Sequence, residues 1–166
     1  MQETTERNLK DAFAGESQAH MKYMLFADRA EREGLPKIAR LFRAASFSEQ
    51  IHATNHLKAL GLGKTPQNLD AAFGGETFEI TTMYPDYMQV AETEGEKRAL
   101  GSMHDAMEAE KVHAALYARA KENVAGGADM ATIVLFVCPV CGFTMEGEAP
   151  ANCPVCGAPS SKFVTF

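Results

Sequence analysis

The sequence lacks cysteine before residue 138, and it lacks any apolar run of about 18 residues. The first absence excludes a disulfide framework in the larger part of the chain. The second predicts no membrane-spanning helix, and the polar start, Met1–Arg7, lacks the apolar core of a signal peptide. We therefore expect a cytoplasmic protein with no membrane partner.

Acidic side chains outnumber basic ones, and the formal net charge is −6. This balance argues against a basic footprint for nucleic acid or for an anionic membrane, and it favours a partner with a basic docking face. The 166 residues are 46% hydrophobic and 23% charged, which is typical of a globular protein. The length suits one domain with a small appendage.

A pattern that carries metal chemistry occurs twice in the chain. Glu49–His52 reads Glu-Gln-Ile-His, and Glu110–His113 reads Glu-Lys-Val-His. In a helix, a spacing of three places the carboxylate beside the imidazole on one face, where both can bind the same metal ion. Two such pairs predict two metal ions.

The repeat includes a glutamate upstream of each pair. The stretch around Glu16 returns 60 residues later around Glu76. Each copy thus offers one glutamate from a first helix and Glu-x-x-His from a second, which is the ligand set of ferritin-like di-iron and di-manganese bundles. Burying several carboxylates without a cation would be strongly unfavourable, so we predict a di-metal centre. Oxygen ligands with two imidazoles favour iron or manganese.

Prolines, glycines and capping residues delimit four predicted helices, which cover about residues 4–34, 36–61, 67–94 and 95–126. Either Thr4 or Thr5 can cap the first helix. Pro85 should break or kink the third, because proline lacks the donor that a continuing helix needs. The prediction is an all-α four-helix bundle.

Further polar residues lie on the faces that we predict to point inward. Glu79 is one acid more than the six-ligand set needs, and we expect it to stabilise the extra positive charge of an oxidised metal pair. His20 and His56 are expected to support ligands or to pack in the core. Tyr23 and Tyr84 either hydrogen-bond a ligand or fill the core.

The cysteines form two Cys-x-x-Cys knuckles, each followed by glycine, which is typical of a four-thiolate site. A segment of about 35 residues has too little core to fold unaided, so a metal should hold it together. The spacing leaves iron and zinc open, and a redox-active neighbour favours iron. A strand-like run, Ile133–Val137, enters the first knuckle. The predicted domains are a helical bundle at 1–127 and a small β-rich metal domain at 128–166.

These motifs together resemble the rubrerythrin family over about residues 4–166. The resemblance rests on Gly15–Ala19, Glu49-x-x-His52, Gly75-Glu76-x-x-Glu79, Met83–Pro85, Glu110-x-x-His113 and the two Cys-Pro-x-Cys-Gly knuckles. It implies a ferritin-like di-iron bundle followed by a rubredoxin-like domain. One departure is His20, where some members have arginine.

The resemblance also implies the ligands. Those of the di-iron centre would be Glu16, Glu49, His52, Glu76, Glu79, Glu110 and His113, with Tyr23 and Tyr84 nearby. One further iron, replaceable by zinc in preparations, would be held by Cys138, Cys141, Cys153 and Cys156. Glu79 matches a position that exchanges with a histidine, here His52, as the iron changes oxidation state.

The activity implied by the resemblance is peroxidase: reduction of hydrogen peroxide to water in oxidative-stress defence. Electrons would come from NADH through a rubredoxin reductase or a small iron-sulfur carrier, and the protein would form a homodimer or a higher homo-oligomer. One alternative is an iron-storage protein with ferroxidase activity, which is also a candidate side activity. Another is an electron carrier or zinc-ribbon module. The tail argues against storage, because storage needs no electron inlet.

Overall fold

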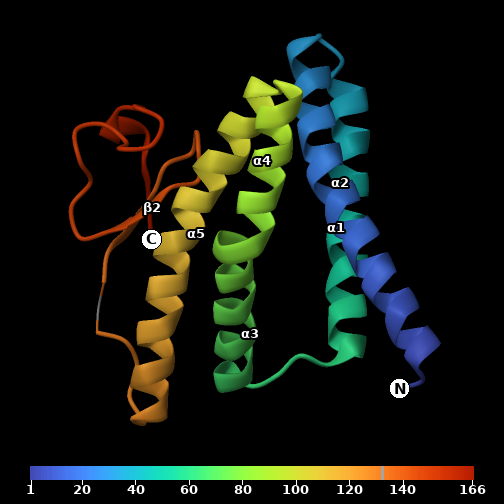
Figure 1. The fold of residues 1–166 in the computed structure, drawn as a ribbon. Coiled ribbons are helices and arrows are strands. Elements are labelled where there is room, and N and C mark those ends of the chain that lie inside the picture. Colours follow the sequence, from blue (N-terminus) through green and yellow to red (C-terminus); the bar gives the residue numbers. More distant parts are fainter. Residues whose placement is uncertain (132) are drawn as a thin grey trace. The chain divides into compact units, whose positions relative to one another are not determined.

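The structure is a computed structural model that describes residues 1–131 and 133–166 (Figure 1). The chain divides into two compact units, Met1–Gly63 and Lys64–Phe166. The helical elements are α1 (Glu3–Arg32), α2 (Pro36–Gly61), α3 (Thr65–Phe78), the π-helical turn η1 (Glu79–Met83), α4 (Tyr84–Glu94) and α5 (Lys97–Ala125). In the part of the chain that is described, no helix is long and apolar enough to cross a membrane.

The first unit is the pair α1 and α2, which lie side by side (Figure 1). Small buried residues such as Ala27 and Ala39 let the two backbones approach closely. The fully buried Ser46 donates its hydroxyl hydrogen to the His20 carbonyl at 2.9 Å, and His20 Nδ1 donates to the Ser46 carbonyl at 3.0 Å. His20 thus joins α1 to α2, in the packing role considered for it.

The start of α1 differs from the prediction. Gln2 is the N-cap residue and makes no side-chain capping bond, so the expected cap by Thr4 or Thr5 is wrong. Glu3 and Glu6 lie in the first turn, where negative charge interacts favourably with the helix dipole. Charge rather than a capping hydroxyl therefore supports this helix end.

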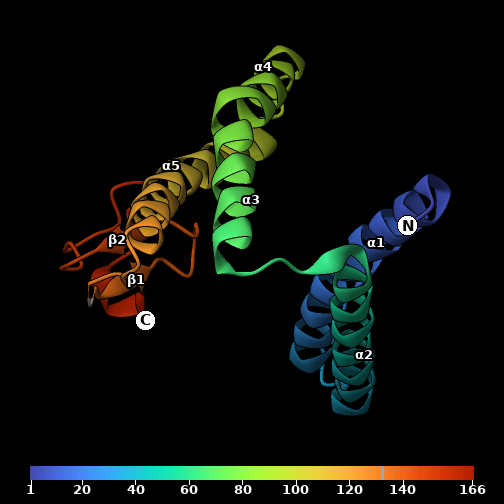
Figure 2. The ribbon, with the colours of Figure 1, turned by 90° about the horizontal axis from the view of Figure 1, so that it is seen from below.

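The second unit packs α3, η1 and α4 against α5 (Figures 1 and 2). The expected interruption near Pro85 takes the form of the π-helical turn, in which the Tyr84 N–H bonds the Glu79 carbonyl five residues earlier. Pro85 follows in the first turn of α4, where its missing N–H is not needed. The chain therefore stays helical until Gly95, whose φ of +74° ends α4.

The tail carries strands β1 (Leu135–Val137), β2 (Thr144–Glu146) and β3 (Val164–Thr165), with the 3-10 turn η2 (Ser160–Lys162) before β3. Within the described residues they form an antiparallel sheet of order β2-β1-β3. The predicted strand begins at Leu135, two residues later than expected. The sheet packs on α5, where Arg119 and Glu146 form an ion pair at 2.5 Å.

The internal repeat is visible in the burial of side chains. Each residue from 11 to 20 has the same degree of exposure as the residue 60 positions later. Beyond η1 the offset becomes 61, so that Tyr23 corresponds to Tyr84 and the buried Ala30 to the buried Ala91. The π-helical turn therefore contains one residue more than the matching part of α1.

Candidate metal centres

The first Glu/His cluster lies in the first unit. It consists of Glu16 on α1 with Glu49 and His52 on α2, and it can offer three ligand atoms within 4.8 Å of one another. His52 Nδ1 lies 2.7 Å from Glu49 Oε2, as the spacing of three predicts. The His52 side chain is 49% exposed, and its Nε2 is 3.5 Å from the Ser48 hydroxyl on the same helix. Among the residues that the structure describes, the hydrogen-bond partners of this imidazole lie on its own helix.

The second Glu/His cluster lies in the second unit and consists of Glu76 on α3 with Glu110 and His113 on α5. His113 Nδ1 is 2.6 Å from Glu110 Oε2 and 3.9 Å from Glu76 Oε1. The His113 side chain is 30% exposed, and its Nε2 is 2.7 Å from Thr144 Oγ1 on β2 of the tail. A separate segment therefore holds the second imidazole.

Each cluster fits a metal ion in geometry and in charge. Ligand atoms bonded at about 2.1 Å to one ion lie at most about 4.2 Å apart, close to the spread found here. Burial raises the pKa of Glu76 to about 7, with further increases from the Glu110 charge, from a hydrogen bond to Glu110 and from Glu79. Acids crowded in this way repel one another, and a cation among them would relieve the repulsion.

Glu79 and Tyr84 both interact with the second cluster. Burial raises the pKa of Glu79, as does the Glu110 charge, while His113 lowers it. Burial also raises the pKa of Tyr84, with contributions from the charges of Glu79, Glu110 and Glu76. The π-helical turn brings residues five apart onto nearby faces, so it places Tyr84 close to Glu79.

Tyr23 has different surroundings within the first unit. Its ring lies 6.1 Å from Phe26 and 6.2 Å from Phe42, and these two rings also meet edge to face at 5.5 Å. This aromatic group joins α1 to α2. Tyr23 therefore contributes to the packing of α1 on α2.

The four cysteines form the third cluster. Sγ of Cys138 and Cys156 are 3.6 Å apart, as are those of Cys141 and Cys153. A tetrahedral ion with metal–sulfur bonds of about 2.3 Å requires sulfurs about 3.8 Å apart, so the spacing suits a single ion. Disulfide bonds, at about 2.05 Å, are excluded, and all four thiols are free.

Backbone groups of the knuckles also favour a metal-bound thiolate. Burial works against ionisation of Cys138, but the N–H groups of Cys141 and Val140, together with neighbouring thiols, lower its pKa to about 7. Gly142 has a φ of +82°, and its N–H bonds the Cys138 carbonyl at 2.8 Å. Glycine is suited to this turn because it adopts positive φ without strain.

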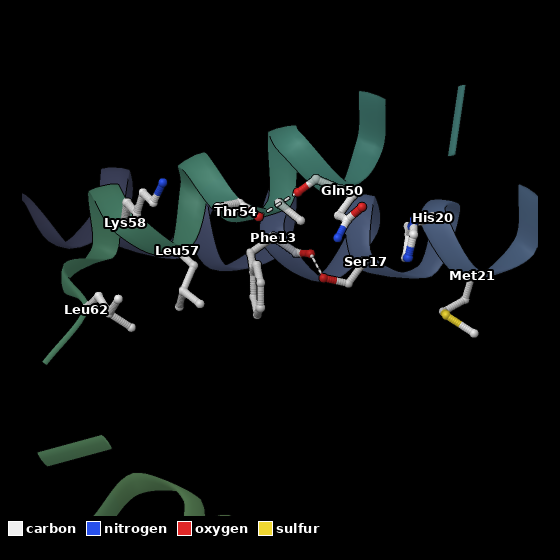
Figure 3. A pocket seen from close by; sticks show the side chains of 10 residues that line it. Phe13, Ser17, His20, Met21, Gln50, Thr54, Leu57, Lys58 and Leu62 are labelled. Atoms are coloured by element: carbon white, nitrogen blue, oxygen red, sulfur yellow. Dashed lines mark hydrogen bonds between the residues drawn. The ribbon is translucent and has the colours of Figure 1, made fainter. Parts of the chain in front are cut away.

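A hollow of about 350 Å³ lies between α1 and α2 in the first unit (Figure 3). Its wall includes Phe13, Ser17, Gln50 and Thr54. The Ser17 hydroxyl bonds the Phe13 carbonyl, and the Thr54 hydroxyl bonds the Gln50 carbonyl, both at 2.7 Å. Because these hydroxyl hydrogens are used within their own helices, we assign the hollow no chemistry.

Thr144 is the residue of these sites that sequence reasoning missed. It is 4% exposed and begins β2, two residues after the glycine of the first knuckle. A lone threonine in a three-residue strand gives no sequence signal. Its contact with His113 depends on the docking of the tail on α5, which no local pattern encodes.

Comparisons with known proteins cover both the helices and the tail. The rubrerythrin family model matches residues 7–121, and the model of the rubrerythrin rubredoxin-like domain matches residues 136–164. The chain is 39% identical to Rubrerythrin-2 of Clostridium acetobutylicum, over 95% of this chain and 94% of that protein. It is 33% identical to nigerythrin of Nitratidesulfovibrio vulgaris, over 98% and 87%.

Solved structures of nigerythrin are also similar. One described as the fully reduced, all-ferrous state matches with a TM-score of 0.55 and 33% identity, over 98% of this chain and 86% of that chain. These matches confirm the predicted fold class. The chain therefore belongs to the rubrerythrin family, with a di-iron carboxylate site in its Glu/His clusters and a rubredoxin-like four-cysteine iron site in its tail.

Proposed function

We propose that this protein reduces hydrogen peroxide to water at its di-iron site and is re-reduced through its four-cysteine iron. The observation that carries the proposal is the docking of the tail on the second Glu/His cluster, where Thr144 bonds His113 within one compact unit. A site of electron entry beside the iron pair is useful to an enzyme, because an enzyme must be re-reduced after each catalytic cycle. Storage of oxidised iron needs no such inlet, so the peroxidase is preferred to the ferroxidase.

The ligands proposed for the iron pair are the six residues of the two Glu/His clusters together with Glu79. Four glutamate charges balance two ferrous ions, and Glu79 offsets part of the charge gained on oxidation. The proposed exchange of Glu79 with His52 agrees with the weak hold on His52, which is half-exposed. His113, held by Thr144, is the imidazole that stays in place.

When bound, two ferrous ions would supply one electron each, which would allow a two-electron cleavage of peroxide without release of a hydroxyl radical. Tyr84 and Glu76 are proposed to hold or release protons beside the metal site. The raised pKa of Tyr84 keeps its phenol protonated at neutral pH, and the phenol can donate a hydrogen bond beside Glu79. Glu76, with a pKa of about 7 in the absence of a cation, releases its proton when metal binds.

Re-reduction proceeds one electron at a time, and the four-cysteine iron is the proposed entry point. The proposed donors are a rubredoxin reductase, fed by NADH, or a small iron-sulfur protein. A net charge of −6 suits a donor with a basic docking face. The proposal also includes a homo-oligomer and, from the free thiols, a reducing compartment such as the cytoplasm.

The test compares oxidants on the reduced, iron-loaded full chain. Rapid mixing with hydrogen peroxide and with air-saturated buffer is followed by the visible absorption of the two iron sites. We expect the faster oxidation with peroxide and unchanged behaviour in Glu108→Gln, since Glu108 is paired with Lys111. A much faster reaction with air, or retention of large amounts of added iron as mineral, would favour the ferroxidase. A protein that stays colourless after iron reconstitution contradicts the role of the tail.

A further inference from the structure

The Thr144 hydroxyl lies between two groups that require it in opposite roles. Its Oγ1 is 3.3 Å from the Gly142 carbonyl and 2.7 Å from His113 Nε2. A hydroxyl has one hydrogen and a carbonyl can only accept, so Thr144 donates to Gly142 and accepts from His113. Nε2 of His113 therefore carries a hydrogen. This leaves Nδ1, which faces Glu110 and Glu76, as the nitrogen that can bind a metal.

The surroundings make this hydroxyl important for the imidazole. A pocket of about 530 Å³ runs beside His113 and Thr144, and its wall includes Leu116, Leu135 and Val137. A ring N–H that lost the hydroxyl would face these apolar side chains and would lose its hydrogen-bond partner in the protein. Glu146, on the same strand as Thr144, forms an ion pair with Arg119 of α5.

The first cluster has no equivalent of this contact in the structure as described. The hydroxyl near His52 belongs to Ser48, which is on the same helix and 3.5 Å away. Residue 109, which corresponds to Ser48 in the repeat, is alanine. In the second cluster the hydroxyl that contacts the imidazole therefore comes from the tail, because the helix of His113 has no serine at the matching position.

We propose that Thr144 is a positioning residue that fixes His113 for metal binding through Nδ1 and links it to the four-cysteine site of the same chain. The link runs from Cys141 through the bonded neighbour Gly142 to the Thr144 hydroxyl and then to His113. The inference rests on the proposed function in one respect, that His113 is an iron ligand.

The first test measures ferrous affinity of the helical sites in the full chain. Thr144→Val deletes the hydroxyl and keeps the shape, and we expect the affinity to fall about 10- to 100-fold, the usual effect of losing such a partner. Thr144→Ser, which keeps the hydroxyl, and Thr165→Val, an exposed control on β3, should bind as the native protein does. An unchanged affinity in Thr144→Val overturns the proposal.

A second variant separates the effect of tail docking from the effect of the Thr144 hydroxyl. Glu146→Gln weakens the ion pair with Arg119 and leaves the Thr144 hydroxyl in place. We expect it to change affinity less than threefold, while the visible spectrum reports an intact cysteine site in every variant. If Glu146→Gln equals Thr144→Val, the tail acts by docking alone and the proposal is wrong.

A third readout does not depend on affinity. In zinc-loaded full chain with ¹⁵N-labelled histidine, the Nε2 hydrogen of His113 should exchange with water at least ten times faster in Thr144→Val than in Thr144→Ser. The signal of His113 is identified as the one that disappears in His113→Ala. If His113→Ala keeps both helical ions, the ligand set in the proposed function fails. If His113→Ala loses them and Thr144→Val behaves as native, this inference alone fails.

Discussion

The two Glu/His clusters belong to the two copies of the internal repeat, and they differ in the contacts around their imidazoles. Each has Glu-x-x-His on one helix and a glutamate on the preceding helix, with nearly equal distances between imidazole and carboxylate, 2.7 Å and 2.6 Å. In the first cluster His52 is half-exposed and held within α2. In the second, β2 holds His113, and the π-helical turn adds Glu79 and Tyr84.

Ligand identity and ligand mobility are therefore encoded separately. The repeated motif supplies the donor atoms, whereas their freedom to move depends on what packs behind them. One anchored and one loosely held imidazole agree with the proposed exchange of Glu79 with His52.

Removing a shared ligand should have the largest effect. Glu110→Ala takes a carboxylate from the second cluster, and Glu49→Ala takes its counterpart from the first. We expect each to weaken iron binding at the helical sites by more than about 100-fold, beyond the effect of an outer partner. Iron titration checks this, with Glu108→Ala as the control. A Glu49→Ala protein that binds two helical ions normally would show that the clusters do not act together.

Removing the metal of the tail should abolish the difference in anchoring between the imidazoles of His52 and His113. Cys138→Ser deletes a buried ligand of the four-cysteine site, whose module is too small to fold without metal. We expect loss of the visible absorption of the thiolate iron and at least a tenfold slower re-reduction, with the first oxidation by peroxide retained. Single-turnover and steady-state rates measure the two steps. Normal re-reduction in a colourless variant would contradict the role of the tail.

Changing Glu79 should make the second cluster more like the first, because the matching residue of the first copy is Ala19. In Glu79→Ala we expect ferric affinity to fall roughly tenfold, which raises the midpoint potential by roughly 60 mV for one electron. Ferrous affinity should change less than about threefold. Spectroelectrochemistry and iron titration test this, with Glu92→Ala, an exposed residue of α4, as the control. Equal changes in both affinities count against the role.

The smallest effect concerns pH. The pKa of Glu76 is raised to about 7, so the folded metal-free protein binds this proton more tightly than the unfolded chain does. Its contribution to stability is full below about pH 4.5 and is lost as pH rises through 7. Because the side chain is partly solvated, we expect a change on the order of 1 kcal/mol. Denaturant unfolding of chelator-treated protein at pH 5 and 8 should show a smaller pH effect in Glu76→Gln than in Glu16→Gln.

The helices and the composition of the clusters could be predicted because they follow from local patterns. Pro36 and Gly61 bound α2 in the structure as in the sequence. The spacing of three in each Glu-x-x-His placed the imidazole beside its carboxylate. The two Cys-x-x-Cys knuckles predict the grouping of the four cysteines that the structure shows. In each case a few neighbouring residues determine the geometry.

The remaining features depend on contacts between distant segments or on small energy differences. The π-helical turn replaces the expected break because Pro85 needs no N–H in a first helical turn, and the preceding residues absorb the distortion. The cap at Gln2 was missed because two threonines nearby offered an equally good signal. The bond between Thr144 and His113 joins residues 31 positions apart, and only the packing of β2 on α5 brings them together.

The single extra residue in the π-helical turn records how the two copies diverged. Glu16 and Glu76 are 60 positions apart, whereas Tyr23 and Tyr84 are 61 apart. The insertion therefore falls between the metal-binding glutamate and the tyrosine, within or beside Glu79–Met83. One residue of difference in length therefore separates a regular helix from one that contains a π-helical turn, and deleting one residue from Glu79–Met83 should give an unbroken α-helix like α1.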